Sequence, residues 1–289
     1  MPRLGAHLSA AGGPSRAVAA AVRVGCRALQ LFQRPPGRWD GKAPAREEID
    51  RFRTAARGAH LEGACFAHAP YLLNLASAGA ELRGRSIRVL VEELVRGGAL
   101  GLAGVVLHPG SAGRGNRAEA EARCRAAIGE AVAAAGDAAA LLVLEGTAGM
   151  GGQLGRTPAE LARLVPGGVH LGICLDTAHL WGAGYDLHGE GWTRVMGEVG
   201  ESWSRAAPEL LHGNDTPVEC GSHRDRHAPP GEGRLGETFF RAMLADDRLT
   251  DTPVVLEIPP GDGELLVREA LRRLQAWSGL ARRRRPARR

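Results

Sequence analysis

The segment LLVLE, at Leu141–Glu145, decides which fold we expect. Its apolar residues follow one another without a polar interruption, and the run ends on a carboxylate. GVVLH, at Gly104–His108, has the same pattern with a histidine at its end. Strands that are apolar on both faces are typical of a parallel sheet covered by helices on both sides. A polar residue at the carboxyl end of such a strand is the first sign of a functional site.

Strand-like runs of this kind alternate with helical periodicity along the chain. TPAE, at Thr157–Glu160, predicts a capping box at the start of one helix, and another helix is predicted from the spacing of Ile87, Leu90, Val91 and Leu94. The predicted strands are Leu4–Leu8, Ala28–Phe32, Gly63–Ala67, Gly104–His108, Leu141–Glu145, Leu171–Asp176, Glu209–Gly213 and Pro253–Ile258.

Eight strand–helix alternations without a break in composition predict an α/β chain folded as a single (β/α)8 TIM barrel. We expect this barrel domain to span residues 1–280, with the active site at the C-terminal ends of the strands. An open, doubly wound sheet is the alternative. Such a fold normally carries G-x-G-x-x-G after its first strand, and HLSAAGG does not match that pattern.

The composition excludes several classes of protein. No apolar run approaches the ~18 residues of a membrane helix, and the N-terminal residues lack the basic-then-apolar order of a secretory signal. Five cysteines, an odd number without a CxxC pair, indicate reduced thiols rather than a disulfide framework. We therefore expect a cytoplasmic protein, and a monomer, without a membrane partner.

The net charge of +5 comes from the last eight residues, RRRRPARR, which hold six arginines. Without these six, the 37 basic residues become 31, against 32 acidic residues. Residues 281–289 are expected to form a disordered arginine-rich tail. Such a tail either adds salt-sensitive affinity for nucleic acid phosphates or is a solvated extension without a role.

Acidic residues and histidines gather where the predicted strands end. Six of the eight strands deliver such a residue to the same rim of the barrel, where isolated carboxylates would be costly without cations. His179 follows closely behind Asp176, and a polar loop, GSHRDRHAPPGEG at 221–233, carries Asp225 and His227, spaced so that both point to one face. The nine candidate ligands are His68, His108, Glu145, Asp176, His179, His212, Asp225, His227 and Glu257.

Imidazoles and carboxylates without thiolates favour zinc, with manganese or iron as alternatives. One zinc ion takes three or four protein ligands, so nine ligands overfill one site and crowd two. Three ions with a bridging carboxylate would use all nine, provided that every one of them is a ligand.

Seven motifs in chain order resemble the endonuclease IV family of apurinic/apyrimidinic endonucleases. They are GAHLSAAGG, HAPYLLNL, HPGS, EGTAG, DTAH with AGYDL, HGND and GSHRDRHAPPGEG, and they span residues 4 to about 258. The resemblance implies a trinuclear zinc TIM barrel of the bacterial cytosol or nucleoid. Its implied reaction is cleavage of double-stranded DNA on the 5′ side of an abasic site, which leaves a 3′-hydroxyl and a 5′-deoxyribose phosphate. Trimming of blocked 3′ ends is also implied.

The resemblance also implies how the ligands divide. His68 and His108 would hold one zinc ion, which Glu145 would bridge to a second. The second would be completed by Asp176, His212 and Glu257, and the third would be held by His179, Asp225 and His227. Catalysis is assigned to Glu145 and Glu257, which would orient or deprotonate the attacking water, and bound metal would supply charge stabilisation.

For DNA contacts, the resemblance points to Tyr71 and Leu72, and we add Arg38 and Arg226 from their place in polar loops. Both tyrosines, Tyr71 and Tyr185, are expected at the barrel mouth. The chain departs from the family at Pro35–Pro36–Gly37, where an arginine is usual, so Arg34 or Arg38 is expected to substitute. Gly146 stands where the family usually has asparagine.

Two other classes of function remain as alternatives. A xylose isomerase-like sugar isomerase or epimerase shares a metal-bearing barrel but would not need His68, His108 and the DRH sequence of the polar loop together. A non-enzymatic DNA-binding relic is disfavoured because every ligand position is filled. Of the remaining histidines, we expect His7 near the mouth, behind the ligands, and we leave the role of His223 open. Three others are expected to be structural or exposed, namely His60, His170 and His188.

Overall fold

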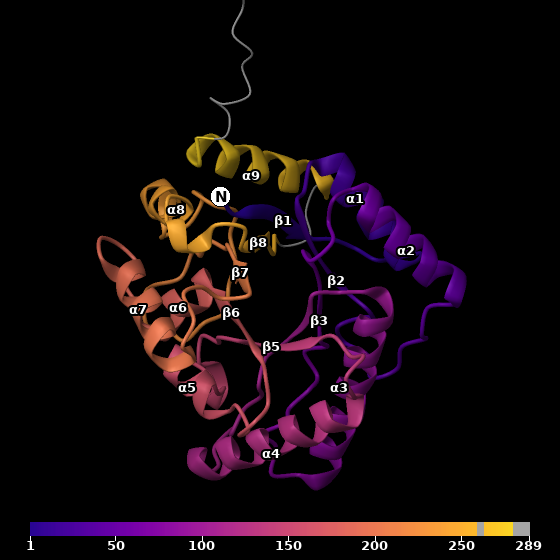
Figure 1. Cartoon of the computed structure of the whole chain (residues 1–289). Coiled ribbons are helices and arrows are strands. Elements are labelled where there is room, and N and C mark those ends of the chain that lie inside the picture. The colour runs from indigo at the N-terminus through magenta and orange to yellow at the C-terminus, as the bar shows by residue number, and fades with distance from the viewer. Residues whose placement is uncertain (259–262, 280–289) are drawn as a thin grey trace, which may run out of the picture.

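The computed structural model describes residues 1–258 and 263–279, and the predicted arginine tail lies outside them. Eight parallel strands pair in chain order and close on themselves, because β1 pairs with β8 as well as with β2. This confirms the closed (β/α)8 barrel and excludes the open sheet (Figure 1). The strands are β1 (Arg3–His7), β2 (Ala28–Phe32), β3 (Cys65–His68), β4 (Gly104–Leu107), β5 (Leu141–Glu145), β6 (Gly172–Asp176), β7 (Leu210–His212) and β8 (Pro253–Leu256).

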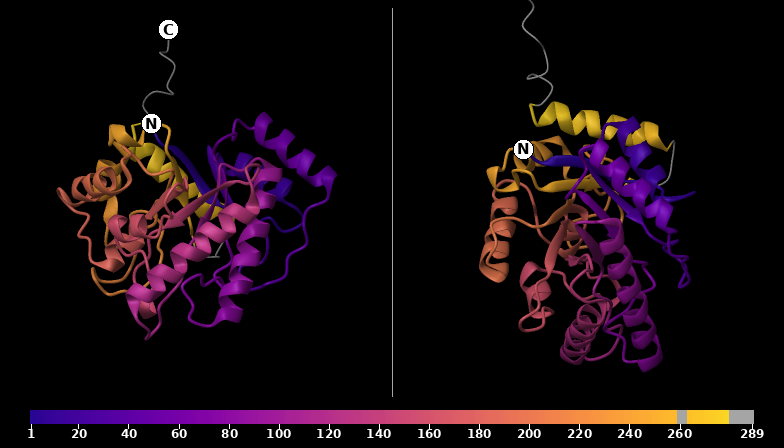
Figure 2. Two further views of the ribbon diagram at one scale, coloured as in Figure 1. Left: turned by 60° about the horizontal axis from the view of Figure 1, so that its bottom comes forward. Right: turned by 45° about the vertical axis from the view of Figure 1, so that its right-hand side comes forward.

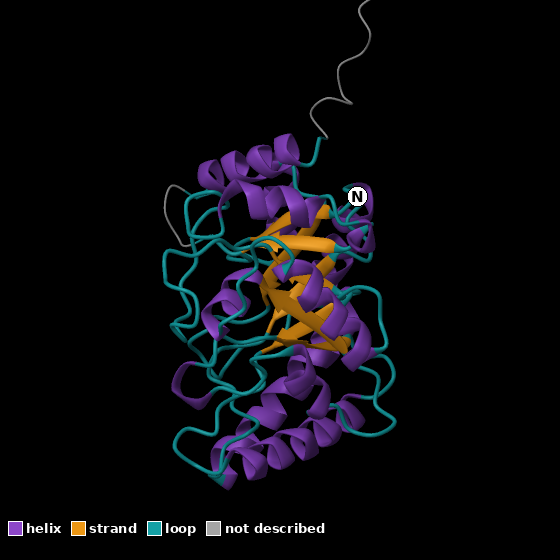
Figure 3. Ribbon diagram, turned by 90° about the vertical axis from the view of Figure 1, so that its left-hand side faces the viewer, coloured by secondary structure: helices purple, strands orange, loops and turns teal. Residues whose placement is uncertain are grey.

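The helices form a ring around the strands, as the end-on view and the side view both show (Figures 1 and 3). The C-terminal helix lies beside the N-terminus and so covers the seam at which the barrel closes (Figure 2). The α-helices are α1 (Pro14–Val24), α2 (Arg46–Gly58), α3 (Ala80–Leu100), α4 (Arg117–Ala135), α5 (Pro158–Arg163), α6 (Thr177–Ala183), α7 (Gly191–Trp203), α8 (Gly236–Leu244) and α9 (Glu264–Trp277). Two short 3₁₀ turns are η1 (Met150–Gly152) and η2 (Asp247–Leu249).

Two buried layers result from the alternation of side chains along each strand. Outward residues such as Leu29, Leu107 and Leu144 pack under the helices in the larger apolar layer. The residues of the second, smaller cluster are Ala28, Ala64, Phe66, Val106, Val143, Cys174, Leu210 and Val255. They alternate with the outward set along their strands and therefore fill the barrel interior.

The strand predictions are confirmed in number and order, and every observed end lies within two residues of the predicted one. β8 ends two residues early, at Leu256, and β3 starts two residues late, at Cys65, because Gly63 takes a left-handed φ of 69° in the turn before it. The predicted capping box is only half formed. Thr157 accepts a hydrogen bond from the backbone N–H of Glu160, but the Glu160 carboxylate turns to the N–H and guanidinium of Arg156 and to Arg117.

Within residues 1–258 and 263–279, no helix is both long enough and apolar enough to cross a membrane.

Candidate metal centre at the barrel mouth

The period of two along each strand brings the predicted ligands to one place. On β3, β5, β6 and β7 the ligand is the last strand residue, and on β4 and β8 it is the next residue in the chain. Each ligand stands two positions after a residue of the inner cluster, as His68 follows Phe66 and Glu145 follows Val143. Because positions i and i+2 share a face, every one of these side chains points inward at the rim.

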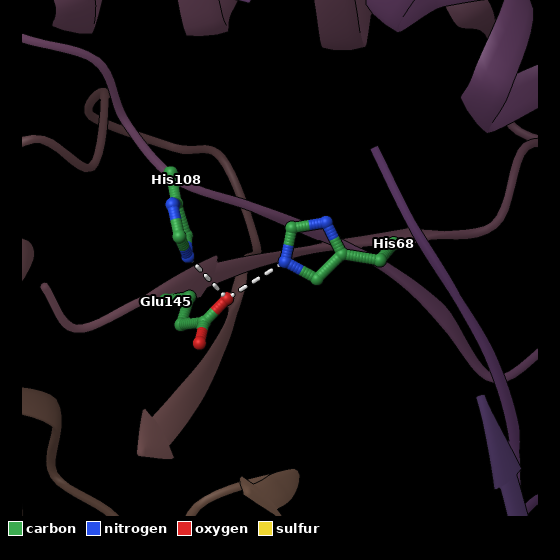
Figure 4. Close-up of side chains that lie close together, drawn as sticks. All are labelled: His68, His108 and Glu145. Atoms are coloured by element: carbon green, nitrogen blue, oxygen red, sulfur yellow. Dashed lines mark hydrogen bonds and ion pairs between the residues drawn. The ribbon is translucent and has the colours of Figure 1, made fainter. Parts of the chain in front are cut away.

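The first group joins His68, His108 and Glu145 (Figure 4). The same carboxylate oxygen, Glu145 Oε2, lies 3.0 Å from His68 Nε2 and 2.9 Å from His108 Nε2. His68 Nδ1 lies 2.7 Å from the carbonyl oxygen of Ala69, which can only accept, so this ring carries its proton on Nδ1. Nε2 is then free to act as a ligand.

The second group joins Glu145, Asp176, His212 and Glu257. Its centre is His212 Nδ1, which lies 2.9 Å from Glu145 Oε1, 3.3 Å from Glu257 Oε2 and 3.7 Å from Asp176 Oδ2. Glu145 therefore faces the first group with one oxygen and the second group with the other. This is the arrangement expected of a bridging carboxylate.

The third group lies nearer to solvent and brings the polar loop onto the strand ends. His179 Nε2 and His227 Nε2 are 3.4 Å apart, and Asp225 Oδ1 lies 3.3 Å from each of them. Asp176 precedes α6, where its Oδ1 accepts from the backbone N–H of His179, so the two share one helical turn as expected. The side chain of Asp225 is 33% exposed, whereas that of His179 is 2% exposed.

The donor sets fit metal ions. Zinc binds nitrogen and oxygen ligands at about 2.0–2.2 Å in tetrahedral geometry, which separates ligand atoms by about 3.3–3.5 Å. The three donors of the third group match this spacing, and in the other two groups the candidate atoms all lie within 4.8 Å of one another. Backbone carbonyls orient His68 and His179, as is usual behind zinc ligands.

The electrostatics agree with a site that needs positive charge. Burial alone would raise the pKa of Glu145, but His108 and His212 hold that pKa well below its ordinary value. Burial would likewise raise the pKa of Glu257, and His212 and His7 lower it well below the ordinary range. The pKa of His212 is raised well above its ordinary value, against the effect of burial, by Cys174, Glu257 and Glu145. Glu145 and Glu257 are therefore held ionised in the barrel interior.

A thiol also reaches this region. Cys174 lies with Glu145 and His212 in a set of donor atoms within 4.8 Å of one another. Burial raises the pKa of Cys174 to about 12. This thiol lies beside the imidazoles and carboxylates that the sequence predicts for the donor set.

Three buried polar residues that the sequence analysis did not single out organise the ligands. Gln30, on β2, contacts both His212 and Glu257. Asn214 donates to Asp176 Oδ2 at 2.6 Å and accepts from the backbone N–H of Glu257 at 2.8 Å. Asp215 accepts from four backbone N–H groups, which belong to Thr216, Gly231, Leu235 and Gly236. The signal for Gln30 was its place two residues after inward-facing Ala28, and Asn214 and Asp215 lie in the HGND motif.

The polar loop is tied down by its own residues as well. His223, left open by the sequence, takes a left-handed φ of 53° and donates through Nδ1 to the carbonyl of Ala148 at 2.9 Å. It therefore anchors the loop to the segment after β5. His7 lies behind the ligands as expected, with Nδ1 3.4 Å from Glu257 Oε1, and His60, His170 and His188 are exposed.

Of the four residues expected to contact DNA, Tyr71 contacts the ligand histidines directly. Tyr71 is 57% exposed, and its ring lies against those of Phe32, His68 and His108. Arg38 and Arg226 are exposed, and Leu72 is half-buried.

Two expectations about the mouth were wrong. Arg34 is buried, with its guanidinium on Glu93 and Glu92 of α3, so it cannot substitute for a DNA-contacting arginine. Tyr185 packs against the apolar layer and donates to Glu198 of α7 at 2.7 Å. Both side chains had polar or aromatic character that suited the mouth, but a partner on a neighbouring helix holds each of them away.

Comparison with known proteins places the whole chain. Residues 18–277 match the family described as xylose isomerase-like TIM barrel. A probable endonuclease 4 from Nitratidesulfovibrio vulgaris strain DP4 is 41% identical over 283 residues, which cover 96% of this chain and 100% of the relative.

Solved structures agree with this assignment. The crystal structure of endonuclease IV from Thermus thermophilus superimposes with a TM-score of 0.85 at 33% identity, over 96% of this chain and 98% of that one. An L-ribulose 3-epimerase reaches a TM-score of 0.71 at 19% identity, over 98% of this chain and 96% of that one, which shows a shared fold only. With a TIM barrel, a cluster of metal-type donors at its mouth and relatives that match 96% of its length, the chain belongs to the endonuclease IV family.

Proposed function

We propose that this protein is a DNA repair endonuclease that hydrolyses the phosphodiester on the 5′ side of an abasic site. The products are a 3′-hydroxyl and a 5′-deoxyribose phosphate, and blocked 3′ ends are trimmed at the same site. The observation that carries the proposal is the convergence of nine imidazole and carboxylate side chains at one end of the barrel. Relatives named endonuclease 4 and endonuclease IV support it.

The nine side chains would hold three zinc ions, with manganese or iron able to replace zinc at some positions. His68, His108 and Glu145 form the first site, and His179, Asp225 and His227 form the third. The second site consists of Glu145, Asp176, His212 and Glu257. When bound, such ions supply a nucleophile at neutral pH and stabilise the developing charge on the phosphate oxygens.

Glu145 and Glu257 are the proposed catalytic residues. Glu145 is fully buried with one oxygen toward each of two ligand groups, so it is held rigidly at the centre. Glu257 is 12% exposed at its side chain, and it lies at the edge that a substrate can reach. Both carboxylates are held ionised, as a group that orients water or takes its proton must be.

The exposed residues around the mouth are the proposed DNA contacts. Tyr71 presents an exposed aromatic ring directly over His68 and His108, where it can replace the stacking lost when a nucleotide leaves the duplex. Leu72 would widen this apolar wedge. Arg38 and Arg226 would bind backbone phosphates, which position a duplex without reading its sequence.

The protein would act as a monomer on DNA in the bacterial cytosol or nucleoid. Among the described residues, seven large apolar side chains are exposed, and they come from several parts of the chain, with two of them on α3. These residues are Met1, Val22, Tyr71, Leu82, Val95, Met150 and Leu265. A stable dimer generally needs a larger contiguous apolar surface.

The deciding experiment is incision of a duplex that carries one tetrahydrofuran abasic analogue. We expect a single cut 5′ to the analogue, loss of cutting with a chelator and recovery on addition of zinc. An unmodified duplex of the same sequence is the control. Binding without a cut would support the relic, and turnover of ketohexoses without a cut would support a sugar epimerase.

A further inference from the structure

The side chain of Gln30 lies in the barrel mouth between two candidate ligands of the second site. It is fully buried on β2, two residues after inward-facing Ala28. Its Nε2 lies 2.7 Å from Glu257 Oε1, and its Oε1 lies 2.9 Å from His212 Nε2. The second N–H of the amide faces His7 Nδ1 at 3.0 Å. Both hydrogens and the carbonyl oxygen of this amide are therefore used.

The partners decide how the amide is oriented. A carboxylate can only accept, so the NH₂ group must face Glu257 and the carbonyl oxygen must face His212. A carbonyl oxygen in turn accepts a proton from the ring, which places an N–H at His212 Nε2. This leaves His212 Nδ1 as the nitrogen that faces Glu145, Asp176 and Glu257.

His212 thus differs from the other buried ligand histidines. His68 and His179 direct Nδ1 to backbone carbonyls, at 2.7 and 2.8 Å, and present Nε2 to the centre. His212 presents Nδ1, and a side chain rather than the backbone holds its outer nitrogen. A backbone carbonyl is supplied by any sequence, but this contact depends on residue 30.

We propose that Gln30 is a positioning residue for the second metal site, which sets the tautomer of His212 and the direction of the Glu257 carboxylate through one amide. The inference rests on the proposed metal-binding role of His212 and Glu257. It assigns Gln30 no contact with substrate. Its loss should weaken metal binding at this site, as loss of a partner behind a metal ligand does, by roughly 10–100-fold.

The test compares the zinc-loaded wild-type protein with Gln30→Leu, Gln30→Glu and a control, Gln33→Leu. Gln33 follows directly after β2, three residues beyond Gln30, but it donates to Glu93 and to none of the ligands. Zinc retained per chain is measured during titration with a competing chelator, and thermal unfolding is followed in parallel. Long-range ¹H–¹⁵N spectra of histidine-labelled protein report which ring nitrogen of His212 is protonated.

For the wild type we expect three zinc ions and a proton on Nε2 of His212. Gln30→Leu should release one ion at roughly 10–100-fold lower chelator concentration, while Gln33→Leu retains all three. Gln30→Glu keeps an acceptor for His212 but faces Glu257 with a like charge, so it should keep the tautomer and still lose the ion. In kinetics, kcat should fall for both Gln30 variants while KM for the abasic duplex stays within about twofold.

Two results would overturn the inference. One is a wild-type spectrum with the His212 proton on Nδ1, which needs no variant and is unaffected by misfolding. The other is a folded Gln30→Leu protein that retains three zinc ions as tightly as the wild type. A wild-type protein that binds no metal at these ligands would instead reject the metal assignment of the proposed function, and the inference with it.

Discussion

Asp215 and Ala228 exchange two backbone hydrogen bonds, of 3.0 and 2.7 Å, and so fix the polar loop to the end of β7. The Asp215 carboxylate also accepts four hydrogen bonds from backbone N–H groups. The donors are Thr216, which follows β7, and Gly231, Leu235 and Gly236, which lie near the end of the polar loop. Close contact with this carboxylate also explains Gly233, where a Cβ would meet Asp215 Oδ1 at only 2.3 Å. The position of Asp225 and His227 over the strand ends depends on this anchor.

Replacement of Asp215 by alanine should therefore affect both stability and the third site. Four backbone N–H groups, two of them in buried and two in partly buried hydrogen bonds, would lose their acceptor, so we expect the free energy of unfolding in urea to fall by about 2–4 kcal/mol. Elemental analysis of the folded fraction should show two zinc ions per chain in place of three. Asp247→Ala, on the exposed turn η2, is the control, and equal zinc contents for the two variants would argue against the anchor role.

Glu145→Gln should stop incision without unfolding the protein. The amide keeps the shape of the side chain but removes the charge that faces both the first and the second ligand group. We expect kcat on the abasic duplex to fall by at least about 10²–10⁴-fold, the range for loss of an acid–base group. Single-turnover kinetics and the circular dichroism spectrum check the two parts, and full activity in this variant would refute the role of Glu145.

Variants of Arg34 and Arg38 should have different effects, with stability lowered by Arg34→Met and DNA binding weakened by Arg38→Ala. Arg34 is buried against Glu93 of α3, with Nε 2.5 Å from Glu93 Oε1, so Arg34→Met removes the nearest cation from a buried carboxylate. We expect the free energy of unfolding to fall by about 3–5 kcal/mol. Arg38 is exposed, and Arg38→Ala should leave stability within about 0.5 kcal/mol but weaken DNA binding and reduce its salt dependence.

Chemical denaturation and fluorescence anisotropy with an abasic duplex measure these two quantities on each variant. The opposite result, a stable Arg34→Met protein with weak DNA binding, would place Arg34 at the interface after all.

Glu160→Gln should reveal a pH-dependent contribution to stability from a carboxylate that is not one of the nine candidate ligands. Burial would raise the pKa of Glu160, but the backbone N–H and guanidinium of Arg156, with Arg117, lower it below its ordinary value of 4.5. A lowered pKa means that the ionised form stabilises the fold above pH 4.5, and that this stabilisation is lost as the pH falls through the lower, folded-state value.

We therefore expect wild type and Glu160→Gln to differ by about 1–2 kcal/mol near pH 7 and to converge below about pH 4.5 in urea titrations. Incision activity at pH 7 should be unchanged, which also makes this variant the matched control for Glu145→Gln. A difference that grows toward acid pH would show that the assigned sign is wrong.

Much of the site could be predicted because the barrel obeys a simple local rule. An apolar run that ends on a histidine or a carboxylate indicates that the strand is buried. It also indicates the direction in which the last side chain of the strand points. His68, His108, Glu145, Asp176 and Glu257 could all be placed at the mouth in this way. The polar loop followed from the spacing of Asp225 and His227.

The burial of Arg34 could not be predicted by this local rule. Arg34 lies next to the mouth in sequence, and only its partners on α3, far along the chain, withdraw it from the surface. The contacts of Glu160 could not be predicted from the sequence either. A capping box and an ion pair compete for its carboxylate, and the outcome depends on Arg117 of another helix.

By itself the sequence determined the barrel and the set of side chains at its mouth, because alternation along a strand and the order of strands are local properties of the chain. The tertiary structure alone decided how those side chains divide into groups, which nitrogen of His212 faces the centre and how Gln30 and Asp215 hold the ligands. These features depend on distances between atoms on different strands, and pairing of the barrel is what sets those distances.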